Sequence, residues 1–531
     1  MGRYKLLLLS LFSGGLLSIP WMANSCSWLL LFAFLPLLII EEHFILRQQS
    51  RGGVSFFFYA LLTFLTWNIL STWWIGYVSF TGMLIIATIN SFLMAVVWWI
   101  AHIIRRTYRT TYFSLIIYWL TFEYLHFIWS MKWPWLTLGN GFAGAVKYIQ
   151  WYEYTGVLGG SLWILLVNVL IYSVIKCLKE KLYQQSIKMT AILCILIALP
   201  VSWSLYRYNT YAESKNRIQV AVLQPNIDPY NDKFSGMTSK DQTLRLVSLA
   251  QHIVNDSTQY VLAPETALET VWENDSLRNS SSLQMFDTLF ARHPRLTVIA
   301  GAITQRKVIE GEPFSYAARR SDHGDLYEVY NSALYINHSP EVQIGHKSIL
   351  VSGVEKIPFQ EYFSFLGKFI VDAGGTSGSL SAATQPTVFK GDHGVGIGSV
   401  ICFESAFGGF VANSVRDGAN ILFVITNDGW WKESAGLIQH FNYSRLRAVE
   451  TRRSIARSAN TGLSGFINEK GDVIKITDCN TATAICGSVT LNDYQTFYVR
   501  HGDYLGWISA VLAGMIALFW IKDFKFSKVA K

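Results

Sequence analysis

The sequence predicts a polytopic α-helical membrane bundle that carries one large α/β domain outside the membrane. The chain is 51% hydrophobic and only 15% charged, whereas soluble globular proteins average about 25% charged residues. Long apolar runs fill residues 1–207 and return once near the C-terminus. The segment 208–502 is mixed in polarity, and it contains no apolar run long enough to cross a bilayer.

Eight apolar segments approach the length of about 20 residues that a helix needs to cross the hydrocarbon core. They lie near residues 5–22, 27–46, 54–78, 80–104, 111–130, 159–178, 188–207 and 503–521. We therefore expect a bundle of about seven helices over 1–207, an extramembrane domain over 208–502, and a C-terminal helix with a short tail over 503–531.

The basic residues predict the orientation of the bundle, because Lys and Arg gather in the cytoplasmic loops of membrane proteins. One set of loop positions holds most of them: Arg3, Lys5, Arg47, Arg51, Arg105, Arg106, Arg109, Lys176, Lys179, Lys181, Lys188, Lys522, Lys525, Lys528 and Lys531. The opposite short loops hold only Lys132 and Lys147. Both termini are expected in the cytoplasm and the domain on the outer face. The net charge of +8 thus indicates membrane topology, and nucleic acid is not an expected partner.

The first apolar run has a second interpretation. Arg3 and Lys5 precede it, and residues 23–26 hint at lipoprotein processing, so it could be a cleaved signal peptide. Because another apolar run follows at once, a helical hairpin is the simpler interpretation.

Two polar or aromatic features stand out in the bundle. Glu123 lies inside the fifth apolar segment, where a carboxylate is costly in lipid, so it is expected to face protein or water. The loop 131–158 is rich in Trp and Tyr, which prefer the membrane interface. It would either anchor the bundle there or form a lipid-facing wall beside a site. Its aromatic residues are Trp133, Trp135, Tyr148, Trp151, Tyr152 and Tyr154.

The segment 208–502 reads as an α/β domain. Short apolar runs predict strands at 218–223, 259–263, 297–303, 331–336, 396–402 and 420–426. The segments 237–255 and 440–453 read as helices between strands. Polar residues follow several strands, at the sheet edge where α/β proteins usually bind ligands.

Cys402 is the candidate nucleophile of this domain, because it follows an apolar strand directly. A reactive cysteine needs a lowered thiol pKa, and so a nearby cation or general base. Lys347 and Glu265 follow strands and are candidates, and a papain-like pairing with His346 or His440 is an alternative. A buried core cysteine is the plainer interpretation. The sequence contains neither an HExxH motif nor a Walker A loop.

A set of short motifs in a fixed order resembles the nitrilase superfamily and, within it, the bacterial apolipoprotein N-acyltransferases. They run through nearly the whole chain: Trp133–Gly139, Val222–Ile227, Pro264–Thr266, Lys347–Val351 with Glu355 eight residues on, Ile401–Glu404, Asn427–Trp430 and Arg457–Gly462. Each motif is weak alone, but their order around a domain set between membrane spans is specific. Three positions depart from the family pattern: Ser352, Gly353 and Phe403.

The resemblance implies a nitrilase-like α-β-β-α sandwich with a catalytic triad of Glu265, Lys347 and Cys402. Glu265 would be the general base, and Lys347 and the backbone N–H after Cys402, that of Phe403, would stabilise the oxyanion. Supporting roles would fall to Glu355 and Glu404, which would hold Lys347 and the leaving group, unless they form surface ion pairs. Asn427, Trp430 and Trp431 would contact substrate, although the two tryptophans could instead pack in the core. Neither a metal nor a cofactor is expected.

The implied reaction is ping-pong acyl transfer, with a phospholipid as acyl donor. A thioester on Cys402 would pass its acyl chain to the amine of an S-diacylglyceryl-cysteine lipoprotein, the last step of lipoprotein maturation. The enzyme would lie in the bacterial inner membrane with its domain in the periplasm. A membrane-anchored amidase acting on a small amide is the alternative, and a lipid transporter is a third, non-enzymatic one. On the oxidising side, Cys479 and Cys486 either form a disulfide or remain two free thiols.

Overall fold

The computed structural model describes residues 1–23, 26–47, 52–108, 111–274, 276–360, 362 and 379–529. The chain divides into two compact units. The first unit comprises residues 1–76, 80–210 and 503–531. The second comprises residues 77–79 and 211–502.

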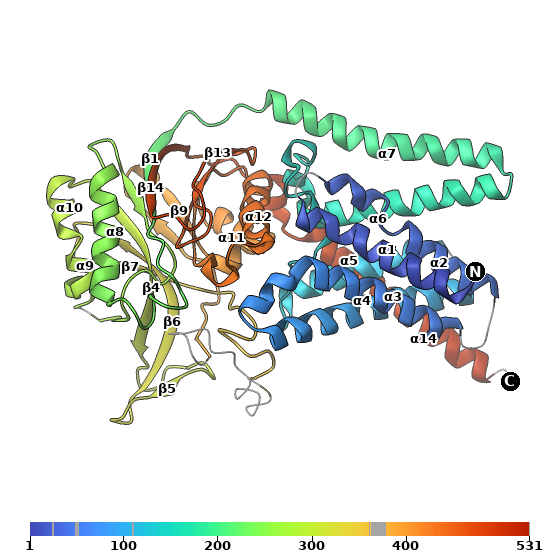
Figure 1. The fold of residues 1–531 in the computed structure, drawn as a ribbon, viewed down its shortest axis with the longest axis horizontal. Helices are drawn as coiled ribbons and strands as arrows, with labels where there is room; N and C mark the ends of the chain where they lie inside the picture. The colour runs from blue at the N-terminus through green and yellow to red at the C-terminus, as the bar shows by residue number, and fades with distance from the viewer. Residues whose placement is uncertain are drawn as a thin grey trace. The chain divides into compact units, whose positions relative to one another are not determined.

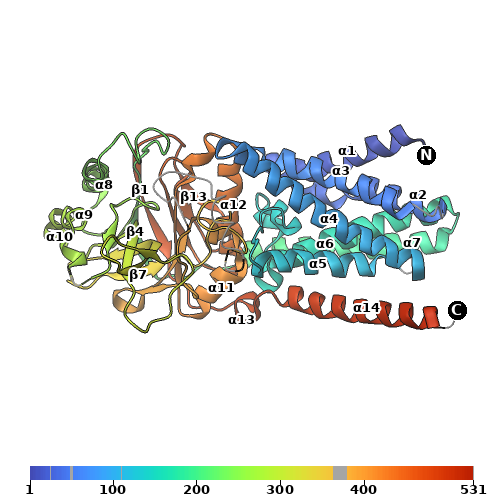
Figure 2. The same ribbon diagram turned by 90° about the horizontal axis from the view of Figure 1, so that it is seen from below.

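The first unit is built from long apolar helices that lie side by side (Figures 1 and 2). In both views α6 and α7 form a helical hairpin, and α14 runs along the other helices of this unit. The helices are α1 (Arg3–Met22), α2 (Leu35–Arg47), α3 (Gly52–Thr72), α4 (Phe80–Tyr108), α5 (Phe113–Ile128), α6 (Tyr152–Lys179), α7 (Tyr183–Thr210) and α14 (Tyr504–Val529).

Among the described residues, seven helical segments are long and apolar enough to cross a membrane. One of them joins the 3₁₀ helix η1 (Ser27–Leu31) to α2. These seven match the expected spans, and the remaining expected span, 111–130, corresponds to α5. With 16 residues, α5 is shorter than the about 20 residues that a bilayer requires. It packs beside α14, and the Tyr118 hydroxyl donates a hydrogen bond to the carbonyl of Ala513 at 3.4 Å.

The bundle buries several charged groups, and each has protein partners. Glu123 faces protein, as expected: its Oε1 accepts hydrogen bonds from the backbone N–H of Leu138 at 2.8 Å and from Trp119 Nε1 at 2.9 Å. Farther along the helices, Glu42 on α2 accepts from Arg105 of α4 at 2.8 Å and from Lys176 of α6 at 2.7 Å. This ion pair network joins three helices.

The aromatic loop 131–158 lies partly inside the bundle. Trp135 is 1% exposed and Tyr152 is fully buried. The Tyr152 hydroxyl donates to the carbonyl of Gly139 at 3.0 Å, and a methyl group on Gly139 would overlap the Val157 carbonyl oxygen. For Trp135 and Tyr152 both expected roles, an interface anchor and a lipid-facing wall, are therefore wrong. Their rings fill the interior because the loop folds back onto α6.

The second unit alternates strands and helices. Its strands are β1 (Arg217–Gln224), β2 (Tyr260–Leu262), β3 (Val271–Trp272), β4 (Thr297–Lys307), β5 (Arg319–Arg320), β6 (Leu326–Ile336), β7 (Gln343–His346), β8 (Val388–Lys390), β9 (Gly396–Ile401), β10 (Ile421–Thr426), β11 (Ile455–Ala459), β12 (Gly465–Ile467), β13 (Val473–Ile476) and β14 (Thr483–Thr490). Its helices are α8 (Ser239–Ile253), α9 (Ser281–Gln284), α10 (Asp287–Arg292), α11 (Gly408–Arg416), α12 (Ala435–Thr451) and α13 (Phe497–His501). All six expected strands and both expected helices are present.

The described strands form two mixed sheets. The first has the order β14-β1-β2-β4-β6-β5, with β3 beside β4 and β7 beside β6. The second has the order β13-β12-β11-β10-β9-β8. The centre of each sheet is parallel: β1 with β2 and β4, and β9 with β10 and β11. Their carboxyl ends therefore meet at common edges.

The two sheets pack face to face, and helices cover both outer faces. Figures 1 and 2 show α8, α9 and α10 on the first sheet and α11 and α12 on the second. Three apolar cores separate these four layers, one under each helical layer and one between the sheets. The central strand β10 is buried along its whole length, because it is covered on both faces. The fold is the expected α-β-β-α sandwich.

Candidate active site

Glu265 lies in a tight turn after β2, and the neighbouring strand β4 holds this turn. The N–H of Gly301 donates to the carbonyl of Pro264 at 3.0 Å, and the Gly301 carbonyl accepts from Ala267 at 2.8 Å. A Cβ atom on Gly301 would lie 2.6 Å from the Cα of Glu265. Only glycine therefore allows the turn to approach β4 this closely.

Lys347 follows β7, and its ammonium group lies between two carboxylates. Its Nζ atom donates to Glu265 Oε1 at 3.0 Å and to Glu355 Oε1 at 2.9 Å. All three side chains are buried. Glu355 is itself held by the N–H of Val351, which donates to its Oε2 at 2.8 Å. The loop that contains the unusual Ser352 thus still brings Glu355 to Lys347.

Cys402 is the first residue of a short 3₁₀ helix, η8 (Cys402–Ala406), which begins where β9 ends. Its φ angle of +52° lies in the left-handed region, which is unfavourable for a residue other than glycine. Strained residues of this kind cluster at functional sites. Phe403, whose N–H was expected in the oxyanion site, is buried, and its ring packs edge-on against Phe407 at 5.1 Å.

Glu404 joins the turn of Cys402 to the loop of Lys347. Its Oε2 accepts from the N–H of Ile401 at 2.8 Å, and its Oε1 accepts from Ser348 at 2.6 Å and Ile349 at 3.2 Å. Both oxygens are therefore engaged with the backbone. The expected contact of Glu404 with a leaving group does not fit this arrangement. Burial raises the pKa of Glu404 to about 7, although these backbone hydrogen bonds oppose the shift.

The charges of the three central groups are coupled. Burial raises the pKa of Cys402 well above its usual value; the Glu265 charge adds to this and the Lys347 charge opposes it. Burial also opposes the ionisation of Glu265, but Lys347 and hydrogen bonds from Asn331 and Cys402 outweigh it and lower the pKa. The two glutamates hold the pKa of Lys347 above its usual value despite burial. The expectation of a lowered thiol pKa is wrong: the resting site holds a thiol, a carboxylate and an ammonium.

Two polar residues of the site were not predicted from the sequence. Asn331, in the middle of β6, donates from Nδ2 to Glu265 Oε1 at 2.8 Å and to Glu355 Oε1 at 3.0 Å. Lys233 is buried, and its Nζ donates to the carbonyl of Thr266 at 2.8 Å. Burial lowers the pKa of Lys233 to about 8, and the nearby Glu265 charge opposes this shift. Because β6 also carries Glu328 and Ser332, the sequence offered no distinctive signal for Asn331.

The residues expected to contact substrate follow β10. The N–H of Asn427 donates to Glu265 Oε2 at 3.0 Å, and its side-chain oxygen accepts from Asn460 at 3.0 Å. Asn427 thus positions Glu265 through its backbone. Trp430 and Trp431 are only partly buried, in the 3₁₀ helix η9 (Asp428–Trp431).

Trp430 forms an aromatic cluster with two exposed rings. It stacks on Phe234 with 5.9 Å between ring centroids, and it meets Tyr230 edge-on at 5.3 Å. Phe234 is 40% exposed and Tyr230 is 41% exposed. A half-buried cluster of this kind presents apolar area at the surface.

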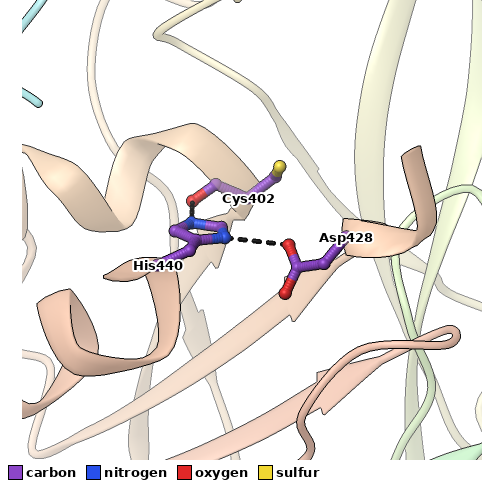
Figure 3. Close-up of side chains that lie close together, drawn as sticks. All are labelled: Cys402, Asp428 and His440. Atoms are coloured by element: carbon purple, nitrogen blue, oxygen red, sulfur yellow. Dashed lines mark hydrogen bonds and ion pairs between the residues drawn. The ribbon is translucent and has the colours of Figure 1, made fainter. Parts of the chain in front are cut away.

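The papain-like alternatives are wrong. His440 Nε2 lies 3.1 Å from the backbone oxygen of Cys402, and Figure 3 shows the sulfur directed away from the ring. His346 contacts Ser332 Oγ at 3.0 Å instead, and burial lowers its pKa to about 4. One possible metal-ligand atom from each of Cys402, Asp428 and His440 lies within 4.8 Å of the other two. However, Asp428 and His440 use their polar atoms in contacts with protein groups.

Cys479 and Cys486 do not form a disulfide; both are free thiols. Cys486 lies on β14 opposite Ala221 of β1, and its Sγ contacts the carbonyl of Ile253 at 3.5 Å. Cys479 contacts Glu433 Oε1 at 3.4 Å. The two thiols are separated because Cys479 precedes the strand and points to a different loop.

The chain is similar to known protein families and to several named proteins. Residues 219–498 match the carbon-nitrogen hydrolase family, and residues 13–170 match the apolipoprotein N-acyltransferase N-terminal domain. The apolipoprotein N-acyltransferase of Chlorobaculum tepidum is 28% identical over 96% of this chain and 95% of that protein. The proteins of that name from Geobacter metallireducens and Thermotoga maritima are each 26% identical over 96% of this chain, and over 94% and 92% of their own lengths.

Proposed function

The chain belongs to the carbon-nitrogen hydrolase family, and we propose that it is an apolipoprotein N-acyltransferase of the bacterial membrane. It moves an acyl chain from a phospholipid to the N-terminal amine of S-diacylglyceryl-cysteine apolipoproteins. One observation carries the proposal: a buried Glu265–Lys347–Cys402 group in a hydrolase fold is joined to helices apolar enough to cross a membrane. A soluble amidase would need no such helices.

Acylation of Cys402 is the first half of the proposed reaction. Glu265 accepts the thiol proton as Sγ attacks the ester carbonyl of the phospholipid, which forms a tetrahedral oxyanion. Lys347 Nζ and the N–H of Phe403 stabilise this oxyanion. The C–O bond then breaks, and the departing alkoxide takes the proton from Glu265. The products are a thioester on Cys402 and a lysophospholipid.

Aminolysis of the thioester is the second half. The α-amine of the lipoprotein cysteine attacks the thioester carbonyl, and Glu265 accepts a proton from the attacking nitrogen. The C–S bond breaks, an amide forms, and Glu265 passes the amine proton to the departing thiolate of Cys402. Lys347 stays charged throughout because Glu355 lies on its other side at 2.9 Å. Glu355 and Asn331 thereby hold the ammonium and the base in place, and Glu404 holds the two loops together.

The membrane setting supports the choice of lipid substrates. The basic loops favour both termini in the cytoplasm and the second unit in the periplasm. Trp430 and Phe234 would then meet the acyl chain, with Trp431 beside them. The half-buried state of these aromatic rings supports this assignment.

Trapping the acyl-enzyme tests the proposal. The purified enzyme is incubated with a phospholipid that carries a fluorescent acyl chain, and hydroxylamine-sensitive label on the protein is measured. Wild type and Cys479→Ser, a control at a free thiol that contacts Glu433, should be labelled equally. Cys402→Ser should carry no thioester and should transfer no acyl chain, because a hydroxyl is far less acidic than a thiol.

Addition of a diacylglyceryl-cysteine peptide should then release the label as an acylated peptide. Hydrolysis of small amides without any labelling would favour the amidase alternative. Activity of Cys402→Ser above a few per cent of wild type would remove Cys402 from its role.

A further inference from the structure

A buried polar network lies directly behind the nucleophile, and the reaction steps above do not use it. His440 and Arg457 are fully buried, and Asp428 is 1% exposed. Asp428 Oδ1 lies 2.8 Å from His440 Nδ1, and Arg457 Nη2 donates to Asp428 Oδ2 at 2.7 Å. These residues come from η9, α12 and β11, so three separate elements converge on one imidazole ring.

The other ring nitrogen of His440 contacts the main chain of the nucleophile. His440 Nε2 lies 3.1 Å from the Cys402 carbonyl oxygen and 2.9 Å from Ser405 Oγ. Because a carbonyl oxygen can only accept, the ring nitrogen is the donor. Ser405 Oγ donates to the same carbonyl at 2.8 Å. Figure 3 shows this oxygen directed toward His440 and the sulfur directed away.

The Cys402 carbonyl matters because of the peptide bond to which it belongs. A peptide unit is planar and trans, so its C=O and N–H point in opposite directions and rotate together. This peptide joins Cys402 to Phe403, whose N–H is the proposed second oxyanion donor. Cys402 has a φ angle of +52°. A strained backbone conformation of this kind persists only where surrounding groups hold it in place.

We propose that His440 is a positioning residue: by holding the Cys402 carbonyl, it aims the Phe403 N–H at the oxyanion. This inference rests on the proposed function, because it assigns His440 a part in acyl transfer. Asp428 and Arg457 hold the ring from behind. Burial opposes ionisation of Asp428, but His440 and Arg457 keep its pKa well below the usual value.

Two amide substitutions separate the two sides of the ring. The amide of Gln reaches the position of Nε2, so His440→Gln keeps a donor for the Cys402 carbonyl. The shorter amide of Asn reaches the position of Nδ1, so His440→Asn keeps the contact with Asp428 and loses the donor. We expect His440→Gln to form the thioester at no less than half the wild-type rate. We expect His440→Asn to form it about 10- to 100-fold more slowly, since losing a whole oxyanion donor costs about 100- to 1,000-fold.

A second readout distinguishes positioning from general structural damage. Alkylation of Cys402 by iodoacetamide displaces iodide and forms no oxyanion, so it needs the thiol but not the Phe403 N–H. In His440→Asn, the alkylation rate at Cys402, followed by peptide mass spectrometry, should stay within about twofold of wild type. The full-length protein in detergent should also keep its melting temperature. His252→Asn is the matched control, because His252 lies exposed on α8.

Equal thioester formation by His440→Asn and wild type would overturn the inference. So would equal losses in the Gln and Asn variants, or a parallel loss of alkylation and thermal stability. These outcomes are distinct from failure of the proposed function, in which wild type itself forms no thioester with any phospholipid.

Discussion

At the reaction centre, Lys347 carries one positive charge between Glu265 and Glu355. At distances of 3.0 and 2.9 Å, two of its N–H groups donate to these carboxylates, and the third would donate to the proposed oxyanion. Asn331 bridges the two carboxylates on the other side, at 2.8 and 3.0 Å. Burying charged groups without partners would cost several kcal/mol each, so the second glutamate makes a permanently charged lysine possible here.

Lys347→Arg should therefore fail almost as badly as Lys347→Ala. Arginine keeps the charge, but its planar fork is larger and cannot occupy a compact site between two carboxylates and an oxyanion. We expect thioester formation to fall by at least about 100-fold, as for the loss of an oxyanion donor. Lys390→Arg, at an exposed position on the same unit, is the control. Near-normal turnover of Lys347→Arg would reduce Lys347 to an electrostatic neighbour.

The pH dependence of acylation should report Glu404. The pKa of Glu265 lies below its usual value, and the pKa values of Cys402 and Lys347 lie above theirs. The charges of these three groups therefore do not change near neutrality. Glu404, with a pKa of about 7, does change. Above this pH we expect the carboxylate to accept from all three backbone N–H groups. Below it one oxygen carries a proton, and we expect the turn of Cys402 to be held less firmly.

The rate of thioester formation should thus rise with pH through a midpoint near 7. It is measured between about pH 5.5 and 7.5, below the pKa of about 8 of Lys233. Glu404→Gln should show a flat profile at the low-pH level of wild type. A flat wild-type profile, or a limb that persists in Glu404→Gln, would contradict this assignment.

At the scale of elements, the turn after β10 supplies two different functions. Its first residues contact Glu265 and His440, and Trp430 near its end packs in the aromatic cluster with Phe234 and Tyr230. Phe234 and Tyr230 come from the segment after β1, more than 190 residues earlier in the chain. The two segments meet because β1 and β10 lie in the two sheets that pack face to face.

Trp430→Ala should slow acylation by a long-chain phospholipid. An aromatic side chain buries 150–250 Å², and apolar burial contributes roughly 25 cal/mol per Å². The loss is therefore at most a few kcal/mol, or about tenfold to a few hundredfold in rate. A short, water-soluble thioester donor should be affected much less. Thioester formation is measured with both donors, beside a melting curve.

Trp272→Ala serves as control, because Trp272 is 45% exposed and packs on Tyr327. Equal losses with both donors, together with a lower melting temperature, would assign Trp430 to packing instead of lipid contact.

At the scale of the whole molecule, the basic loops predict on which side of the membrane the termini and the second unit lie. Lys181, in the turn between α6 and α7, and Asn480, before β14, are both exposed. In a variant without native cysteines, Asn480→Cys should react with a membrane-impermeant maleimide in cells whose outer membrane is permeabilised. Lys181→Cys should react only after lysis. The reverse pattern would invert the proposed orientation.

The sequence by itself determined which segments are apolar and which alternate strand and helix, because these depend on local composition. It therefore predicted six of the fourteen described strands and two of the six described α-helices of the sandwich. It also predicted eight membrane spans, of which all but α5 are helical segments long enough to cross a membrane. Its ordered motifs also named Glu265, Lys347 and Cys402, which the structure brings to one site.

Only the tertiary structure decided how these residues meet and what their surroundings do to them. Glu265 and Lys347 are 82 residues apart, and no local pattern reports such a contact. The raised thiol pKa, the bridging Asn331 and the His440 network all arise from burial against distant elements. The inward-facing Trp135 and Tyr152 have the same cause: hydropathy measures how apolar a residue is, whereas packing decides whether lipid or protein covers it.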